Sequence, residues 1–275
     1  MRQVTQDTKD VVILAAGYGS RLSNYGNGTA AAGKVNGTSH KEELDKLKPL
    51  TEVGGMPLIF RTLNNMEYAG VRNAHIVIGY KGELLKEKIA NNYKGNLNLN
   101  FVENQEYDLS NGVSLLKVKD TIDRPFILTM ADHVFEPAIA RIAGRHKPVQ
   151  GGATLLVDYK VDSIFDIDDA TKVKAKDGKL QDIGKNIPEY NCIDTGIFVA
   201  TPALFDHLEQ IFHQNGDVSL SEGVKLLADE HKMQVLDIEG AFWQDIDTPE
   251  MLKYAEWVLQ ERQFVYETFR ASRVK

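Results

Sequence analysis

Apolar runs and helical patterns alternate through the first half of the chain. Residues 11–16 are wholly apolar and precede a glycine-rich loop, which is typical of a strand buried on both faces of a parallel sheet. Three more strands are predicted at 74–78, 97–102 and 126–130, separated by helices at 57–69, 82–92 and 111–122. This rhythm favours an α/β fold with a mostly parallel, Rossmann-like central sheet and helices on both faces.

The second half is more mixed. Its predicted strands lie at 153–159, 172–176, 179–183, 193–200 and 234–238, and its predicted helices at 202–213, 220–231 and from 248 toward 270. Asp177-Gly178 separates two of the strands and is a strong hairpin signal. We find no fixed-period repeat. The pattern therefore predicts one domain over residues 1–275 that ends in a helical extension at 248–275.

Residues 24–46 interrupt this pattern with several glycines, small residues and a charged stretch. The segment is too irregular to belong to the core. One interpretation is a flexible surface insertion. The other is an active-site lid, because the segment directly follows the glycine-rich loop.

Charge and composition narrow the class of protein. The net charge is −7, the sequence pI is about 5.6, and the basic residues are scattered, so no nucleic-acid partner is expected. The single cysteine, Cys192, cannot form an internal disulfide, which fits a reducing cytoplasm. The polar N-terminus does not resemble a signal peptide, and no apolar run is long enough to span a membrane. We expect a cytoplasmic protein with no membrane segment in this chain.

The loop after the first strand carries the strongest chemical signal. It reads Leu14-Ala15-Ala16-Gly17-Tyr18-Gly19-Ser20-Arg21-Leu22. Its glycines let the backbone approach a phosphate closely. Arg21 adds a planar set of donors that suits phosphate oxygens. The loop is therefore predicted to bind a phosphate-bearing ligand.

Two familiar phosphate-binding patterns do not fit this region. A dinucleotide fingerprint requires a third glycine where Leu22 stands. A Walker-type pattern at 28–34 has Val35 in place of the required Ser or Thr, and no apolar strand directly precedes it. The loop instead resembles the glycine-rich signature of nucleotidyltransferases.

Carboxylates stand at two further positions of chemical interest. Asp132 ends the predicted strand 126–130, and the carboxyl ends of parallel strands are where such sheets bind ligands. Mg²⁺ prefers oxygen ligands of this kind. Asp245 and Asp247 are candidate partners, because they lie on the same side of an extended chain. The alternative is that Asp247 or Thr248 only caps the helix opened by Pro249.

The resemblance continues along most of the chain. Lys48-Pro49-Leu50, followed by Gly54-Gly55 and Pro57-Leu58-Ile59, is similar to the second motif of nucleotidyltransferases. Later motifs lie at 111–115, 183–185, 190–198 and 219–223. Together they resemble the cytidylyltransferases that activate phosphoalcohols, of the inositol-1-phosphate cytidylyltransferase type. Members of that type are often fused to a membrane phosphotransferase.

This resemblance implies a role for each matching residue. It implies that Arg21 and Lys48 stabilise the triphosphate, and that a late carboxylate joins Asp132 on Mg²⁺. It also implies that Lys185 is a catalytic residue that contacts the acceptor phosphate. The remaining implied contacts are Asn111 and Gly112 near the nucleotide, and Asp194 and Thr195 on the acceptor side. The alternatives for these later residues are a helix cap, a hairpin end or a turn.

The expected reaction transfers CMP from CTP to a small phosphoalcohol, with inositol 1-phosphate as the first choice, and releases pyrophosphate. Phosphocholine and 2-aminoethylphosphonate are alternative acceptors. Two competing hypotheses are a sugar-1-phosphate nucleotidyltransferase that uses another nucleotide, and a non-catalytic nucleotide-binding protein. The sequence carries neither a zinc-binding pattern nor a Gly-x-Ser-x-Gly elbow. The apolar face of the last helix is predicted to pack internally or to form a homodimer surface.

Overall fold

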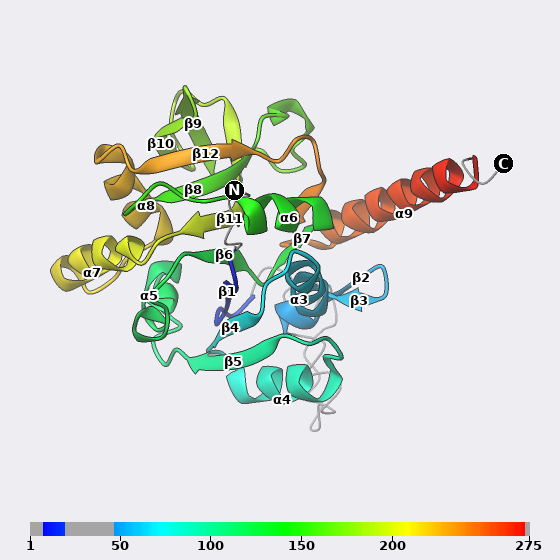
Figure 1. Cartoon of the computed structure of the whole chain (residues 1–275), viewed down its shortest axis with the longest axis horizontal. Helices are drawn as coiled ribbons and strands as arrows, with labels where there is room; N and C mark the ends of the chain where they lie inside the picture. The colour runs from blue at the N-terminus through cyan, green and yellow to red at the C-terminus, as the bar shows by residue number, and fades with distance from the viewer. Residues whose placement is uncertain (1–7, 20–46, 273–275) are drawn as a thin grey trace, which may run out of the picture.

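A nine-stranded mixed sheet forms the centre of the computed structural model, which describes residues 8–19 and 47–272, with side chains to 262 (Figure 1). In spatial order the strands are β5 (Asn98–Glu103), β4 (Asn73–Ile78), β1 (Asp10–Ala15), β6 (Phe126–Met130), β11 (Cys192–Ala200), β8 (Ala153–Asp158), β12 (Met233–Asp237), β10 (Lys179–Gly184) and β9 (Lys172–Lys176). Residues 24–46, which the sequence marks as an insertion, lie outside the described residues.

The first half of the sheet is parallel, as the sequence predicts. β5, β4, β1 and β6 pair in parallel register. β11 then runs antiparallel between β6 and β8, and β12 pairs with β8 in parallel. β9 and β10 form the predicted hairpin, with Asp177 and Gly178 both at positive φ (52° and 72°). The carboxyl ends of the parallel strands therefore open toward one edge of the sheet.

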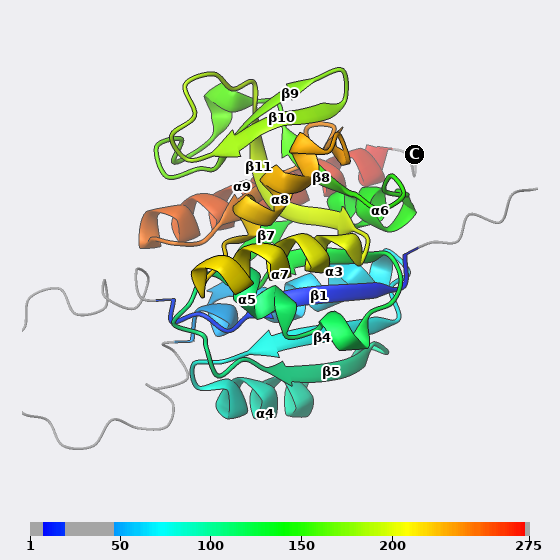
Figure 2. The same cartoon turned by 90° about the vertical axis from the view of Figure 1, so that its left-hand side faces the viewer.

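Alternate residues of β1 pack into two separate cores on opposite faces of the sheet. Val11 and Ile13 pack into one cluster together with α3 (Leu58–Tyr68), α4 (Gly82–Asn92) and α6 (Pro137–Arg145). Val12 and Leu14 pack into the other, together with α5 (Asn111–Leu116), α7 (Ala203–Asn215) and α8 (Leu220–Asp229). The side view shows α5 and α7 in front of β1 (Figure 2). Helices thus cover both faces of the sheet, and β1 is therefore buried at every position.

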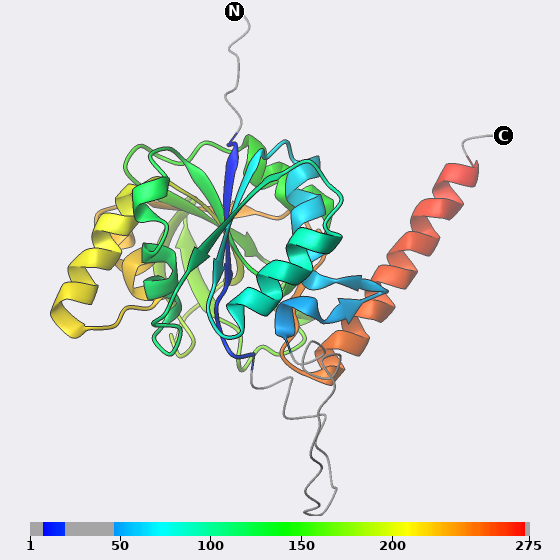
Figure 3. The ribbon, with the colours of Figure 1, turned by 90° about the horizontal axis from the view of Figure 1, so that it is seen from below.

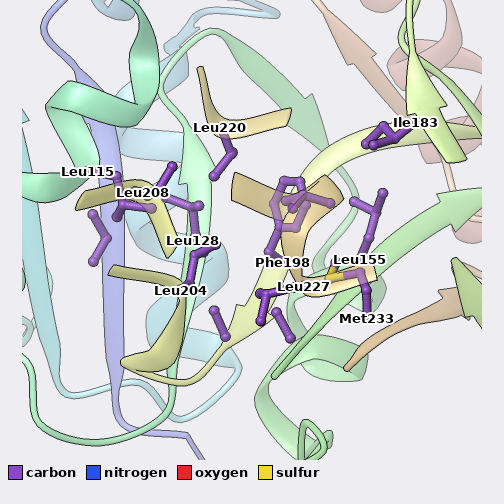
Figure 4. Packing of buried hydrophobic residues seen from close by; sticks show 14 of the residues in the cluster. Leu115, Leu128, Leu155, Ile183, Phe198, Leu204, Leu208, Leu220, Leu227 and Met233 are labelled. Atoms are coloured by element: carbon purple, nitrogen blue, oxygen red, sulfur yellow. The ribbon is translucent and has the colours of Figure 1, made fainter. Parts of the chain in front are cut away.

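Leucines of α7 and α8 belong to the second core. Leu204 and Leu208 of α7 lie on the side of Leu115 and Leu128, and Leu227 of α8 lies beside Phe198 (Figure 4). Burial of each such side chain contributes roughly 1.5–3 kcal/mol relative to exposure.

The structure adds elements that the periodicity does not predict. α6 follows Glu136, and the short strands β7 (His133–Phe135) and β13 (Trp243–Asp245) pair antiparallel with His133 opposite Asp245. A second small pair joins β2 (Glu52–Val53) to β3 (Met56–Pro57). β7 and β13 form a two-stranded sheet of their own, which holds Asp245 and directly follows Asp132.

The helix predicted at 111–122 is too long. α5 ends at Leu116, and the chain continues as a 3-10 turn at Lys119–Thr121. The β-branched residues after Leu116 have low helix propensity. The Thr121 hydroxyl donates to the Val118 carbonyl at 2.8 Å, a local bond that competes with the helix.

α9 (Pro249–Ser272) leaves the body of the molecule as a long helix (Figure 3). Its first turns pack Ala255 and Val258 against Val134 and Ile246 in a third small cluster. Trp257 stays 56% exposed. Within the described part of the chain, no helix combines the length and the apolar character that a membrane span requires.

Candidate nucleotide-transfer site

The glycine-rich loop lies directly against Lys48. A Cβ at Gly19, where φ is +61°, would stand 2.6 Å from the Lys48 Cβ. The preceding turn is fixed because the Tyr80 N–H donates to the Ala16 carbonyl at 2.9 Å. Glycine at position 19 therefore permits both the positive φ and the close approach to Lys48. Ser20 and Arg21, the other predicted residues of this loop, lie outside the described residues.

Lys48 connects two carboxylates that are distant in sequence. It opens the 3-10 helix η1 (Lys48–Leu50) and is 9% exposed. Its Nζ donates to Asp132 Oδ2 at 2.7 Å and also to Asp247 Oδ1. Asp132 follows β6 and Asp247 precedes α9, so the fold joins residues separated by 84 and 199 positions. The structure thus brings together three of the predicted site residues.

Thr248 caps helix α9, whereas Asp247 faces the site. The Thr248 Oγ1 accepts from the Met251 N–H at 3.2 Å, as an N-cap does at the start of α9. Asp247 is left to face Lys48. The capping alternative therefore holds for Thr248 and does not describe Asp247.

Opposite charges shift the pKa values of this group. Burial alone would raise the pKa of Asp132, but Lys48 and His133 outweigh it and hold the pKa far below its usual range. Burial alone would lower the pKa of Lys48, but Asp132 and Asp247 raise it. Burial raises the pKa of Asp245, and the nearby carboxylates add to that rise, although His133 opposes it. The site therefore concentrates negative charge around one ammonium group.

The predicted magnesium ligands fit a hard cation by their chemistry. Asp132, Asp245 and Asp247 all line the larger cavity and supply carboxylate oxygens. The carboxylate neighbours that raise the pKa of Asp245 create repulsion that a cation would relieve. In this conformation, however, Lys48 lies between Asp132 and Asp247, and among the described residues no group of three ligands is arranged around a common point. A bound divalent ion would require Lys48 or the carboxylates to shift.

Two adjoining cavities meet at this cluster. The larger, of about 670 Å³, extends from Asn111 to Lys185, and the smaller, of about 310 Å³, follows the glycine-rich loop past Lys48. Both are lined by Leu14, Gly17, Asp132 and Asp247. Ala15 lines the smaller cavity and Ala16 the larger. The combined space is large enough for a nucleotide beside a second small ligand.

Two of the residues predicted on the acceptor side line the larger cavity. Lys185, which follows β10, forms an ion pair with Asp169. Asp194 accepts from the Gly196 N–H at 2.7 Å, and burial raises its pKa to about 6. Thr195 is fully buried, and its hydroxyl donates to the Leu156 carbonyl at 2.8 Å. Thr195 therefore belongs to the core, and the expectation that it lines the acceptor side is corrected.

Of the predicted pair Asn111 and Gly112, only Asn111 lines a cavity. Asn111 lines the larger cavity, and its Oδ1 accepts from the Leu220 N–H at 2.8 Å. Gly112 is buried with its Cα toward the loop before α8, so that a Cβ would stand 2.5 Å from the Val218 carbonyl oxygen. Gly112 therefore packs against the loop before α8 and, unlike Asn111, does not line the cavity; its place near the nucleotide stays a prediction.

The cavity also includes residues that are not among the predicted site residues. Asp158 ends β8 and is 3% exposed, and its Oδ2 accepts from Trp243 Nε1 at 3.1 Å. His133 and Tyr107 line the same cavity. Asp158 stands at the carboxyl end of a parallel strand, as Asp132 does, so this signal was present in the sequence.

Comparison with known proteins identifies the family. Residues 11–217 match the MobA-like NTP transferase domain. The chain belongs to this family of nucleotidyltransferases. Its fold is the α/β fold of that family, in a single domain.

Individual relatives are more specific. A bifunctional IPC transferase and DIPP synthase from Aquifex aeolicus is 32% identical over 78% of this chain and 49% of its own length. A protein of the same name from Archaeoglobus fulgidus is 32% identical over 90% of this chain and 43% of its own length. The chain thus spans about half the length of these relatives.

A solved structure extends the comparison to three dimensions. The inositol-1-phosphate CTP transferase from T. maritima superposes with a TM-score of 0.74 at 24% identity, over 92% of this chain and 98% of that one. At this identity the likeness establishes the fold.

Proposed function

We propose that this domain transfers CMP from CTP to a small phosphoalcohol, with inositol 1-phosphate as the first candidate, and releases pyrophosphate. The observation that carries the proposal is Lys48 held between Asp132 and Asp247 where the two cavities meet. A buried cation beside a glycine-rich loop suits a reaction in which charge moves between phosphate groups. The base and acceptor are supported by the names of the relatives and of the solved structure.

The two cavities suggest how the substrates divide the space. In this proposal the triphosphate lies along the smaller cavity, over Gly17 and Gly19, and the acceptor occupies the larger one near Lys185 and Asp194. An acceptor phosphate oxygen would then attack the α-phosphorus in line, and pyrophosphate would leave on the opposite side. The phosphate is already anionic at neutral pH, so the attack needs no strong general base.

Lys48 has the central role in this mechanism. Its ammonium would neutralise charge on the transferring phosphate once it moves away from a carboxylate. Arg21 is proposed to stabilise the departing pyrophosphate. When bound, Mg²⁺ would neutralise charge on the triphosphate, with Asp132, Asp245 and Asp247 as its proposed ligands.

The test is a matrix of pyrophosphate-release assays with Mg²⁺. Each of the common nucleoside triphosphates is paired with inositol 1-phosphate, phosphocholine, 2-aminoethylphosphonate, glycerol phosphate or glucose 1-phosphate. Turnover with CTP and inositol 1-phosphate is expected. Turnover only with another nucleotide and glucose 1-phosphate would refute the substrate assignment, and turnover with no pair would favour a nucleotide-binding role.

A further inference from the structure

His133 is held in one orientation beside Asp132. The Nδ1 of His133 lies 2.6 Å from Asp132 Oδ1, while the other oxygen, Oδ2, accepts from Lys48. Each oxygen of this carboxylate therefore has its own partner, on a different side of the carboxylate. Rotation of the carboxylate would break both bonds at once.

Packing around the imidazole ring fixes its direction. The ring stacks on Trp243 with 6.2 Å between centroids and 14° between planes. On another side it meets Gly196, where φ is +72° and a Cβ would stand 2.6 Å from His133 Nε2. Any side chain at position 196 would displace the ring, so the absence of one is part of this arrangement.

The backbone supports the same orientation. His133 opens β7 and lies opposite Asp245 in the pair with β13. Trp243, which stacks on the ring, comes from that same strand and is itself held by Asp158. The two strands contribute a carboxylate each, Asp132 just before β7 and Asp245 at the end of β13. The short β7–β13 pair thus couples the imidazole to both carboxylates.

We propose that His133 is a positioning residue, which fixes the Asp132 carboxylate so that Oδ2 points at the Lys48 ammonium, the cation of the site. The inference rests on the proposed function of that site. It follows from the hydrogen bond at Nδ1 and the immobilised ring, since a carboxylate held at one oxygen presents the other in a fixed direction. Partners that orient a charged ligand in this way typically affect metal affinity or activity by about 10–100-fold.

Two neutral substitutions separate this role from simple packing. In His133→Asn the amide nitrogen takes the place of Nδ1 and keeps a donor for Asp132. In His133→Gln the amide nitrogen extends toward the position of Nε2, so the donor to Asp132 is lost. Both variants replace the ring by a polar amide and lose the Trp243 stack. His213→Gln, at an exposed position on α7, is the matched control.

Three measurements are compared across these variants: kcat and KM for CTP, Mn²⁺ binding to the nucleotide-free protein by calorimetry, and the melting temperature. His133→Gln is expected to weaken Mn²⁺ binding and kcat/KM by about 10–100-fold. His133→Asn and His213→Gln should remain close to wild type in Mn²⁺ binding and in kcat/KM. Equal losses in His133→Gln and His133→Asn would overturn the positioning role in favour of packing, as would wild-type values in His133→Gln.

The same data distinguish this inference from the proposed function. If the wild-type protein turns over CTP and all variants bind Mn²⁺ equally, the positioning role fails and the reaction stands. If no acceptor supports turnover but only His133→Gln loses Mn²⁺ affinity, the reaction fails and the positioning role stands.

Discussion

Replacing Lys48 by methionine removes the cation of the site but keeps most of its side-chain volume. The Lys48 side chain is 10% exposed and contacts Asp132 and Asp247, whose side chains are 32% and 8% exposed. Without the ammonium, two carboxylates face each other with no positive charge between them. Both the reaction and the stability of the fold should therefore suffer.

The structure sets the expected magnitudes. Loss of one well-placed donor to a reacting phosphate costs on the order of 10²–10³ in kcat. Removing one partner of a buried ion pair costs about 3–5 kcal/mol of unfolding free energy, and the partial exposure of Asp132 places Lys48→Met near the lower limit. For a chain of 275 residues, a loss of about 3 kcal/mol corresponds to a fall of roughly 6 °C in Tm.

The stability difference between wild type and Lys48→Met should also depend on pH in a defined direction. Lys48 helps to hold the pKa of Asp132 below its unfolded value. The resulting stability is present above about pH 4 and is lost as the pH falls toward the folded pKa. The difference in stability between wild type and Lys48→Met should therefore narrow below about pH 4.

Urea unfolding at several pH values and pyrophosphate release at about pH 7.5 test this prediction. Lys86→Met is the control, because the pair of Lys86 with Glu83 on α4 is exposed; its effect should stay within about 0.5 kcal/mol. A Lys48→Met protein with wild-type turnover and stability would refute the reasoning. A stability gap that widens in acid would refute its electrostatic part.

Three single contacts yield further predictions. Asp132→Asn should lose at least about 10²-fold in kcat with an unchanged far-UV circular dichroism spectrum; normal turnover would contradict its role. Gly112→Ala should lower the unfolding free energy by about 1–3 kcal/mol, because its Cβ would stand 2.5 Å from the Val218 carbonyl; urea titration measures this, and no loss would contradict the contact. The pKa of Asp194, raised to about 6 by burial, means that wild-type stability falls as the pH rises from about 4 to 6. Asp194→Asn should therefore be more stable than wild type by up to about 3 kcal/mol above pH 6 and nearly equal to it below pH 4; an advantage that grows in acid would contradict this.

The sequence by itself determined the elements that depend on local pattern. α4 has the predicted bounds of 82–92, and the Asp177-Gly178 turn joins the two strands that it was expected to join. β1 covers 10–15, one residue from its prediction. These predictions are confirmed because periodicity, turn chemistry and helix signals all act over a few residues.

The sequence also located Asp132, because the apolar strand before it has a clear end. The sequence could not show which second carboxylate, besides Asp132, pairs with Lys48. Asp245 and Asp247 have the same residue type and line the same cavity, and the choice depends on how α9 and β13 dock against β7. Likewise, Thr195 and Asp194 are neighbours in the same strand, and only the pleat against β8 decides which faces the cavity.

Tertiary structure decided the rest of the site. β7 and β13 are three residues long and carry no periodic signal of their own; they exist because their backbones pair across more than a hundred residues of sequence. That pairing places Trp243 against His133 and Asp245 opposite it. The sequence therefore determined where phosphate and carboxylate chemistry belongs, since short-range pattern encodes strand ends and glycine loops. Only long-range packing decided which charges meet, because ion pairs depend on distances that no local pattern specifies.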